Sequence, residues 1–130
     1  MEKTTRTTII AGSAILIVIV GILAYTNTLT GAPSKYDGFA QCLKDKGAIF
    51  YGAFWCPHCQ KQKALFGSAK KYLPYVECST PDGRGQTAVC NEKGINNYPT
   101  WVFPDMSSST GEVALSVLSE KTTCPLPVTE

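Results

Sequence analysis

The sequence lacks an excess of charge of either sign. Twelve basic and ten acidic residues leave a net charge of +2 across 130 residues, so the basic surplus that nucleic-acid binding needs is missing. No repeat or compositional period runs through the chain, which excludes collagen-like and other repeat proteins. Hydrophobic residues make up 44% of the sequence, too large a share for a chain that is disordered on average. The length fits one domain.

Charged residues are absent altogether between Thr7 and Ser34. Within this window, residues 9–26 begin with the apolar run IIAGSAILIVIVGILAY. As a helix, this run and its flanking threonines span roughly 30 Å, which is the hydrocarbon thickness of a bilayer. The pattern therefore predicts one transmembrane helix over residues 9–26 that acts as a signal anchor.

The charges that flank this segment predict its orientation. Lys3 and Arg6 precede it, and no charged residue follows until Lys35. The positive-inside rule then places residues 1–8 in the cytoplasm and the chain after Thr26 outside it. A cleaved signal peptide is an alternative that also exports the domain, and a buried helix of a soluble protein is another. We expect a single-pass protein of the cell membrane with an extracytoplasmic C-terminal domain.

The rest of the chain divides by composition into a linker (residues 27–34), a domain (residues 35–124) and a proline-containing tail (residues 125–130). Within the domain, apolar patterns and turn residues predict alternating helices and strands. Helices are expected over residues 36–46, 57–72, 87–93 and 113–121, and strands over residues 48–54, 74–78, 100–103 and 111–113. Such alternation calls for an α/β fold in which helices flank a sheet on both faces.

A C-x-x-C motif lies where a buried strand is followed by a helix. Cys56 comes directly before Pro57, a residue well suited to the first turn of a helix. At this position, free backbone N–H groups and the helix dipole stabilise a thiolate. Cys59 lies one helical turn further on the same face, so a disulfide between the two cysteines closes with little backbone movement.

This placement predicts thiol–disulfide exchange. Cys56 is the sulfur that forms a mixed disulfide with a partner, and Cys59 resolves it. When charged, His58 favours the Cys56 thiolate and can donate a hydrogen bond to it. The redox-active disulfide is the only redox group expected, with no cofactor and no metal. A structural disulfide and a zinc site are the alternatives; zinc is disfavoured because a second C-x-x-C is missing and Pro57-His58 at a helix start does not make a zinc knuckle.

Longer stretches around this motif resemble a known family. The sequence FWCPHC, followed about forty residues later by Tyr-Pro-Thr at residues 98–100, resembles the thioredoxin superfamily. The C-P-H-C tetrad is similar to that of bacterial disulfide oxidases. The stretches YGAFWCPHCQKQKALFG, YVECS and GINNYPTWVF resemble the thioredoxin-like domain associated with bacterial vitamin K epoxide reductase homologues. The resemblance implies a thioredoxin-like fold with a central mixed sheet, here preceded by the transmembrane helix.

The resemblance also implies a substrate-binding set beside the cysteines. Pro99 would be a cis-proline facing the C-x-x-C, and the backbone of Tyr98 would pair with an extended substrate chain. Thr100 follows them, and Trp55 would flank the reactive sulfur on the exposed rim. An ordinary trans proline before a strand is the alternative for Pro99.

One departure from the family concerns the resolving cysteine. Many thioredoxins carry a buried carboxylate six residues before the first cysteine, where this chain has Phe50. Water or another group must then accept the proton of Cys59. Glu77 is a candidate, although its place in a strand is equally that of an ordinary exposed residue.

Four further cysteines are expected to form two structural disulfides. Protein disulfide isomerase domains, which the segment around Cys78 and Cys90 also resembles, place two cysteines similarly, and a Cys78–Cys90 bridge would contribute about 3 kcal/mol. A second redox pair is the alternative. Cys42 and Cys124 are then paired by elimination. Four cysteines permit three connectivities, and the sequence does not choose among them.

Together these features predict a membrane-anchored, extracytoplasmic oxidoreductase that exchanges disulfides with exported thiol-containing proteins. The resemblance implies an oxidase that is recharged by a quinone-linked membrane partner of the vitamin K epoxide reductase type. Two alternatives stay open. One is an anchored reductant or isomerase, such as those serving cytochrome c maturation, and the other is a non-catalytic module that binds a peptide or a metal.

Overall fold

A computed structural model describes residues 15–25 and 33–128, which belong to two compact units. The first unit ends at Ala32 and the second begins at Pro33. In the first unit, residues 15–25 are helical, and their large apolar side chains are exposed. The predicted residues 1–8, residues 27–32 of the linker and the last two residues of the tail lie outside the described residues.

The prediction of a transmembrane helix before the domain is wrong for the part of the chain that the structure describes. Across residues 15–25 and 33–128, no helix combines the length and the apolar character needed to cross a membrane. The helical residues 15–25 rise about 16 Å, roughly half of the hydrocarbon thickness. Residues 9–14 and 26 of the predicted span lie outside the described residues.

The second unit is built on a mixed sheet of four strands with the order β2-β1-β3-β4. The strands are β1 (Ile49–Gly52), β2 (Tyr75–Glu77), β3 (Thr100–Val102) and β4 (Ser108–Thr110). β1 pairs in parallel with β2 and antiparallel with β3, and β3 pairs antiparallel with β4. The central β1 is buried because it lies between two other strands and carries apolar side chains on both faces.

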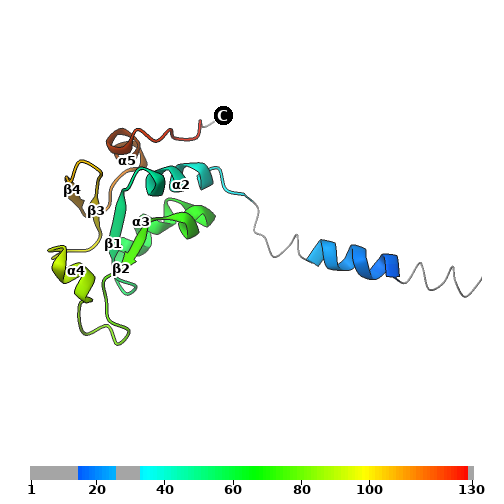
Figure 1. Ribbon diagram of the computed structural model, residues 1–130, viewed down its shortest axis with the longest axis horizontal. Helices are drawn as coiled ribbons and strands as arrows, with labels where there is room; N and C mark the ends of the chain where they lie inside the picture. Colours follow the sequence, from blue (N-terminus) through cyan, green and yellow to red (C-terminus); the bar gives the residue numbers. More distant parts are fainter. Residues whose placement is uncertain (1–14, 26–32, 129–130) are drawn as a thin grey trace, which may run out of the picture. The chain divides into compact units, whose positions relative to one another are not determined.

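Helices cover both faces of this sheet (Figure 1). They are α2 (Asp37–Asp45), α3 (Pro57–Ala64), the 3₁₀ helix η1 (Gly67–Tyr72), α4 (Ala88–Glu92) and α5 (Leu115–Thr122). The larger core contains Phe50 and Trp101 of the sheet together with side chains of α2, α3, η1 and α5. The smaller core on the opposite face joins Tyr51 to Cys90 of α4. A mixed sheet with helices in this arrangement is consistent with a thioredoxin-like fold.

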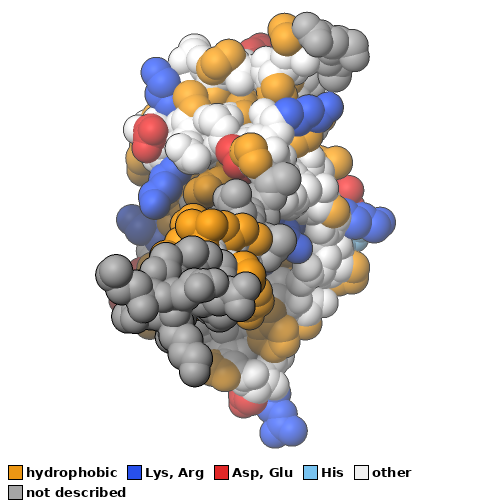
Figure 2. Space-filling view, turned by 90° about the vertical axis from the view of Figure 1, so that its right-hand side faces the viewer, with side chains coloured by type: hydrophobic (Ala, Val, Ile, Leu, Met, Phe, Trp, Pro, Cys, Tyr) orange, Lys and Arg blue, Asp and Glu red, His pale blue; other side chains and the backbone are white. Residues whose placement is uncertain are grey.

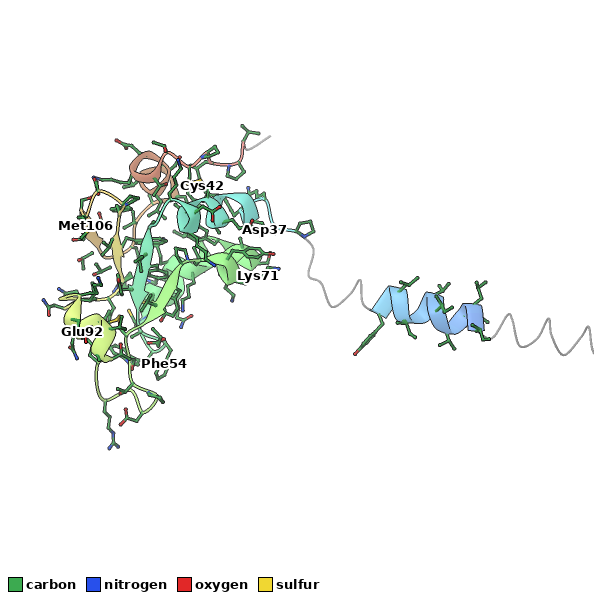
Figure 3. All side chains as sticks on the ribbon, in the orientation of Figure 1. Asp37, Cys42, Phe54, Lys71, Glu92 and Met106 are labelled. Carbon is green, nitrogen blue, oxygen red and sulfur yellow. A yellow bond between two sulfur atoms is a disulfide. The ribbon has the colours of Figure 1, made fainter. Side chains whose placement is uncertain are left out.

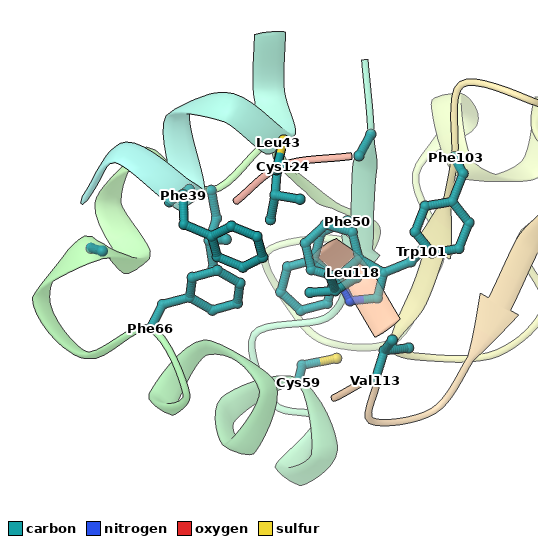
Figure 4. Close-up of a cluster of buried hydrophobic side chains, with 14 of the residues drawn as sticks. Phe39, Leu43, Phe50, Cys59, Phe66, Trp101, Phe103, Val113, Leu118 and Cys124 are labelled. Carbon is teal, nitrogen blue, oxygen red and sulfur yellow. The ribbon is translucent and has the colours of Figure 1, made fainter. Parts of the chain in front are cut away.

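Stacked aromatic rings fill the larger core (Figure 4). Phe50 and Trp101 stack with ring centroids 4.9 Å apart, and Phe39 of α2 stacks on Phe66 at 5.9 Å. Cys59 of α3 lies in the same cluster and is fully buried. The aromatic core therefore forms one wall of the environment of this thiol.

Two elements differ from their predictions. The helix expected over residues 57–72 ends at Ala64, and η1 follows it, because Gly67 adopts a positive φ of 56° that interrupts the α-helix. Leu65, the C-cap residue of α3, is 43% exposed. The edge strand expected over residues 111–113 lies at residues 108–110 instead. Its Ser-Ser-Thr sequence has no apolar alternation because an edge strand buries little of its side chains.

Two disulfides fasten the domain. One joins Cys42 of α2 to Cys124 after α5, with Cα atoms 5.8 Å apart, and the other joins Cys78 to Cys90 of α4, with Cα atoms 5.5 Å apart.

On the face displayed in Figure 2, the basic and acidic side chains outside the grey atoms are scattered, in keeping with the small net charge.

Candidate active site

The two remaining cysteines lie at the start of α3. Cys56 is the N-cap residue, and Pro57 occupies the first turn, where a missing N–H costs no helical hydrogen bond. The backbone N–H of Cys59 donates to Cys56 Sγ at 3.4 Å. Both thiols are free and buried. The sulfur of Cys56 thus receives one of the N–H groups that the helix start leaves unpaired.

A cis peptide bond links Tyr98 to Pro99 beside this helix start. The Cys56 thiol donates to the Tyr98 carbonyl oxygen at 3.7 Å, so the segment before β3 lies against the first cysteine. Thr100, which follows, is buried, and its hydroxyl donates to the Asn97 carbonyl oxygen at 2.8 Å. Its hydroxyl is therefore engaged in the local turn, while Tyr98 and Pro99 lie beside the sulfur.

An aromatic rim borders Cys56. Trp55 is 53% exposed, and its indole N–H donates to Ser79 Oγ at 2.8 Å. The Tyr98 ring meets the Trp55 ring edge-on at a centroid distance of 6.1 Å. Phe54, labelled at the end of β1 in Figure 3, is also half exposed. Phe54 and Trp55, the two residues before Cys56, thus offer exposed aromatic surface to an approaching molecule.

Cys59 differs from Cys56 in its surroundings. Burial raises the pKa of the Cys59 thiol to about 12, the nearby Cys56 adds to this rise, and Lys63 opposes it through its positive charge. Desolvation disfavours a thiolate because the charge loses its hydration. Cys59 therefore needs a partner that removes its proton before its sulfur can act as a nucleophile.

His58 contacts a carboxylate that the sequence did not bring to notice. Its Nδ1 lies 2.7 Å from Glu112 Oε1, and Lys61 Nζ lies 3.9 Å from the same oxygen. This nitrogen is therefore committed to Glu112, whereas the sequence suggested a hydrogen bond from His58 to Cys56.

A buried amide holds the segment of Glu112 against α3. Gln62 is fully buried; the Val113 N–H donates to its Oε1 at 2.6 Å, and its Nε2 donates to the Val113 carbonyl oxygen at 3.0 Å. The only sequence signal for this contact was a polar residue three positions after Cys59 on a face that must be buried. These two bonds fix Glu112, the residue before Val113, beside the C-x-x-C helix.

Glu77, the last residue of β2, is held by several hydrogen bonds. Its Oε1 accepts the backbone N–H groups of Phe54 at 3.2 Å and Ser79 at 2.8 Å, and its Oε2 accepts the Tyr75 hydroxyl at 2.7 Å. Lys63 Nζ lies 3.3 Å from the centroid of the Tyr75 ring. Burial lowers the pKa of Lys63, and the negative charge of Glu77 opposes that decrease.

In residues 15–25 and 33–128, no group of three or more His, Cys, Asp or Glu side chains is arranged to hold an ion. The geometry is instead that of two thiols at a helix start beside a cis-proline. Such an arrangement can form and open a disulfide.

Similarity to a known protein bears on what these two thiols do. No family model matches the chain. The chain is 46% identical over 107 residues to the thiol-disulfide oxidoreductase LTO1 of Arabidopsis thaliana, and the match covers 77% of this chain. It spans 28% of the length of that relative. The chain is thus similar over most of its length to one part of a thiol-disulfide oxidoreductase, and its mixed sheet with helices is consistent with a thioredoxin-like fold.

Proposed function

We propose that the protein catalyses thiol–disulfide exchange with cysteines of other proteins through Cys56 and Cys59. The observation that carries the proposal is the position of Cys56 as the N-cap of α3, with its sulfur next to the Tyr98 carbonyl before the cis-proline. A thiolate at a helix N-terminus is stabilised by unpaired N–H groups and by the helix dipole. The LTO1 relative is named for this same reaction.

In this mechanism Cys56 carries the mixed disulfide and Cys59 resolves it. The Cys59 N–H contacts Cys56 Sγ, which places the buried residue one helical turn from the sulfur that it must attack. Pro57 fixes the first turn, and the Tyr98 backbone, whose carbonyl oxygen accepts the Cys56 thiol, would pair with an extended chain once the thiol has reacted. Trp55 would cover the apolar side of a bound peptide.

The direction that we propose is oxidation of protein thiols in a compartment outside the cytoplasm. Two disulfides besides the C-x-x-C pair favour an oxidising compartment. The proposed acceptor of electrons is a quinone-linked membrane oxidoreductase of the vitamin K epoxide reductase type, a partner that rests on the sequence resemblance. The exposed Phe54 and Trp55 offer apolar surface where such a partner can reach Cys56.

The experiment is catalytic oxidation of a dithiol peptide, with glutathione disulfide present to regenerate the enzyme. Turnover should be lost in Cys56→Ser, while Ser116→Ala, which changes an exposed hydroxyl of α5, should behave like the wild type. Retained turnover in Cys56→Ser would contradict the proposal, and a wild type without turnover would favour a binding module. Equilibration with glutathione then gives the direction: a potential near −120 mV marks an oxidant, and one near −270 mV a reductant.

A further inference from the structure

The buried thiol of Cys59 poses a problem of proton transfer, and its solution rests on the proposed function. Only a thiolate attacks a disulfide, yet this residue is fully buried and burial raises its pKa to about 12. Phe50 of β1 cannot accept the proton, because its side chain is a hydrocarbon ring. This ring stacks on Trp101 and contacts the Tyr75 ring edge-on. A proton acceptor must come from another element.

The neighbouring strand β2 brings such a group close. Gly52 pairs in register with Glu77, just as Phe50 pairs with Tyr75 two residues earlier. A methyl group on Gly52 would lie 2.9 Å from Cys59 Sγ and 3.0 Å from Tyr75 Cε2. The thiol and the ring edge next to the Tyr75 hydroxyl therefore face each other across the side chain that glycine lacks.

The hydroxyl of Tyr75 continues this line to a carboxylate. It donates to Glu77 Oε2 at 2.7 Å, and Lys63 Nζ lies over the ring at 3.3 Å. The charges of Lys63 and Glu77 both act on this cluster, and burial together with the Glu77 hydrogen bond raises the pKa of Tyr75. Tyr75 thus keeps its proton at neutral pH and can pass one on only as it receives another.

We propose that Glu77, reached through the Tyr75 hydroxyl, accepts the proton of Cys59 when the C-x-x-C disulfide closes. The Cys59 thiol gives its proton to Tyr75 Oη while Tyr75 gives its own to Glu77. The Cys59 thiolate then attacks Cys56 Sγ, a Cys56–Cys59 bond forms, and the bond from Cys56 to the partner sulfur breaks. The partner leaves as a thiolate with the electron pair of that bond.

The reverse step uses the same groups. A partner thiolate attacks Cys56 Sγ, the Cys56–Cys59 bond breaks, and Cys59 leaves as a thiolate that takes a proton through Tyr75 from protonated Glu77. Lys63 lies beside the developing charge and stabilises it, in line with its opposition to the raised pKa of Cys59. The relay therefore serves either direction of exchange.

A stopped-flow experiment with an aromatic disulfide reagent, dithiobis(nitrobenzoate), separates the two cysteines. Attack by Cys56 releases one coloured thiolate, and resolution by Cys59 releases a second. In Glu77→Gln the second phase should slow about 100-fold at pH 7, a typical contribution of acid–base catalysis, and the first phase should change little. The rate of the second phase in Glu77→Gln should then rise with pH, because hydroxide takes the place of the carboxylate as the proton acceptor.

Three further reactions make the result specific. Tyr75→Phe removes the hydroxyl but leaves Glu77 bonded to the Phe54 and Ser79 N–H groups, and it should slow the second phase as Glu77→Gln does. Added imidazole should restore part of that phase. Glu92→Gln, which changes an exposed carboxylate of α4 outside these contacts, is the matched control and should behave like the wild type.

The outcomes distinguish the relay from the proposed function. A second phase that is as fast in Glu77→Gln as in the wild type would overturn the relay and leave the proposed function standing. Slowing in Glu77→Gln without slowing in Tyr75→Phe would equally overturn the route through the hydroxyl. Failure of the wild type to release the first thiolate would overturn both. The pH profile is compared at constant ionic strength, since Lys63, Tyr98 and Cys56 also carry titratable groups close to Cys59 and Glu77.

Discussion

Replacing Gly52 by alanine adds one methyl group where the buried thiol meets strand β2. That carbon would lie 2.9 Å from Cys59 Sγ and 3.0 Å from Tyr75 Cε2, whereas non-bonded carbons prefer about 3.5–4.0 Å. Neither neighbour can move freely, because Cys59 is fully buried and the Tyr75 ring is held by Phe50 and by its bond to Glu77. We therefore expect Gly52→Ala to lower the free energy of unfolding by about 1–3 kcal/mol, the usual range for overpacking.

The assay is urea unfolding of the protein with the Cys56–Cys59 pair reduced and the other two disulfides intact. Gly38→Ala on α2 is the matched control, because a methyl group there meets nothing within 4 Å. Alanine in a helix is better than glycine by roughly 0.5–1 kcal/mol, so this control should gain stability. Gly52→Ala that is as stable as the wild type would refute the close packing of Cys59 on β1.

Three other predictions follow from single contacts. Gln62→Leu leaves the buried N–H and carbonyl groups of Val113 without their hydrogen-bond partners, at a cost of about 1–3 kcal/mol each. Urea unfolding should therefore show a large loss of stability in Gln62→Leu that the exposed Gln41→Leu does not show. Equal stabilities of the two variants would contradict the role of Gln62 in holding Val113. Removing both cysteines of the Cys42–Cys124 bridge, with a sequence separation of 82, should cost about 4.5 kcal/mol, against about 3 kcal/mol for Cys78–Cys90 with a separation of 12; the reverse order in unfolding measurements would argue against these pairings. Iodoacetamide at pH 7.5 should label Cys56 and spare Cys59, since burial favours the neutral form of the Cys59 thiol and raises its pKa to about 12. Labelling of Cys59 should grow only as the pH rises toward that value. Equal labelling of the two cysteines at pH 7.5, measured by peptide mapping, would contradict this prediction.

Local sequence signals were enough to predict most elements of the domain. The apolar run at residues 48–54 and the proline at position 57 are local signals, because each predicts structure from residues that are adjacent in the chain. The strand β1 and the start of α3 lie within those predicted ranges. Gly67 carried the information that the helix breaks, but glycine inside a helical pattern is often tolerated, so the break was not predicted.

The apolar run at residues 9–26 shows the limit of hydropathy as a guide. Its composition satisfied the criteria for a membrane span, yet the described helical residues, 15–25, are too few to cross a bilayer.

The contacts around the cysteines could not be predicted, because they join distant parts of the chain. His58 and Glu112 are 54 residues apart, and Gln62 and Val113 are 51 apart. Glu77 could be named as a candidate base, but the proposed route to it from Cys59 depends on the register of β1 with β2 and on the close approach of Cys59 and Tyr75 to Gly52. Such register is set by the packing of the whole sheet.

The most direct test of the account is intact-mass analysis of the Cys59→Ser variant after incubation with a peptide disulfide. Without a resolving thiol, the variant should accumulate one mixed disulfide, located at Cys56 by peptide mapping and released by dithiothreitol. The Cys56→Ser variant should form none at neutral pH, because Cys59 is buried and protonated. An unmodified Cys59→Ser protein, or an adduct that forms equally well in Cys56→Ser, would contradict the assignment of Cys56 as the exchanging sulfur.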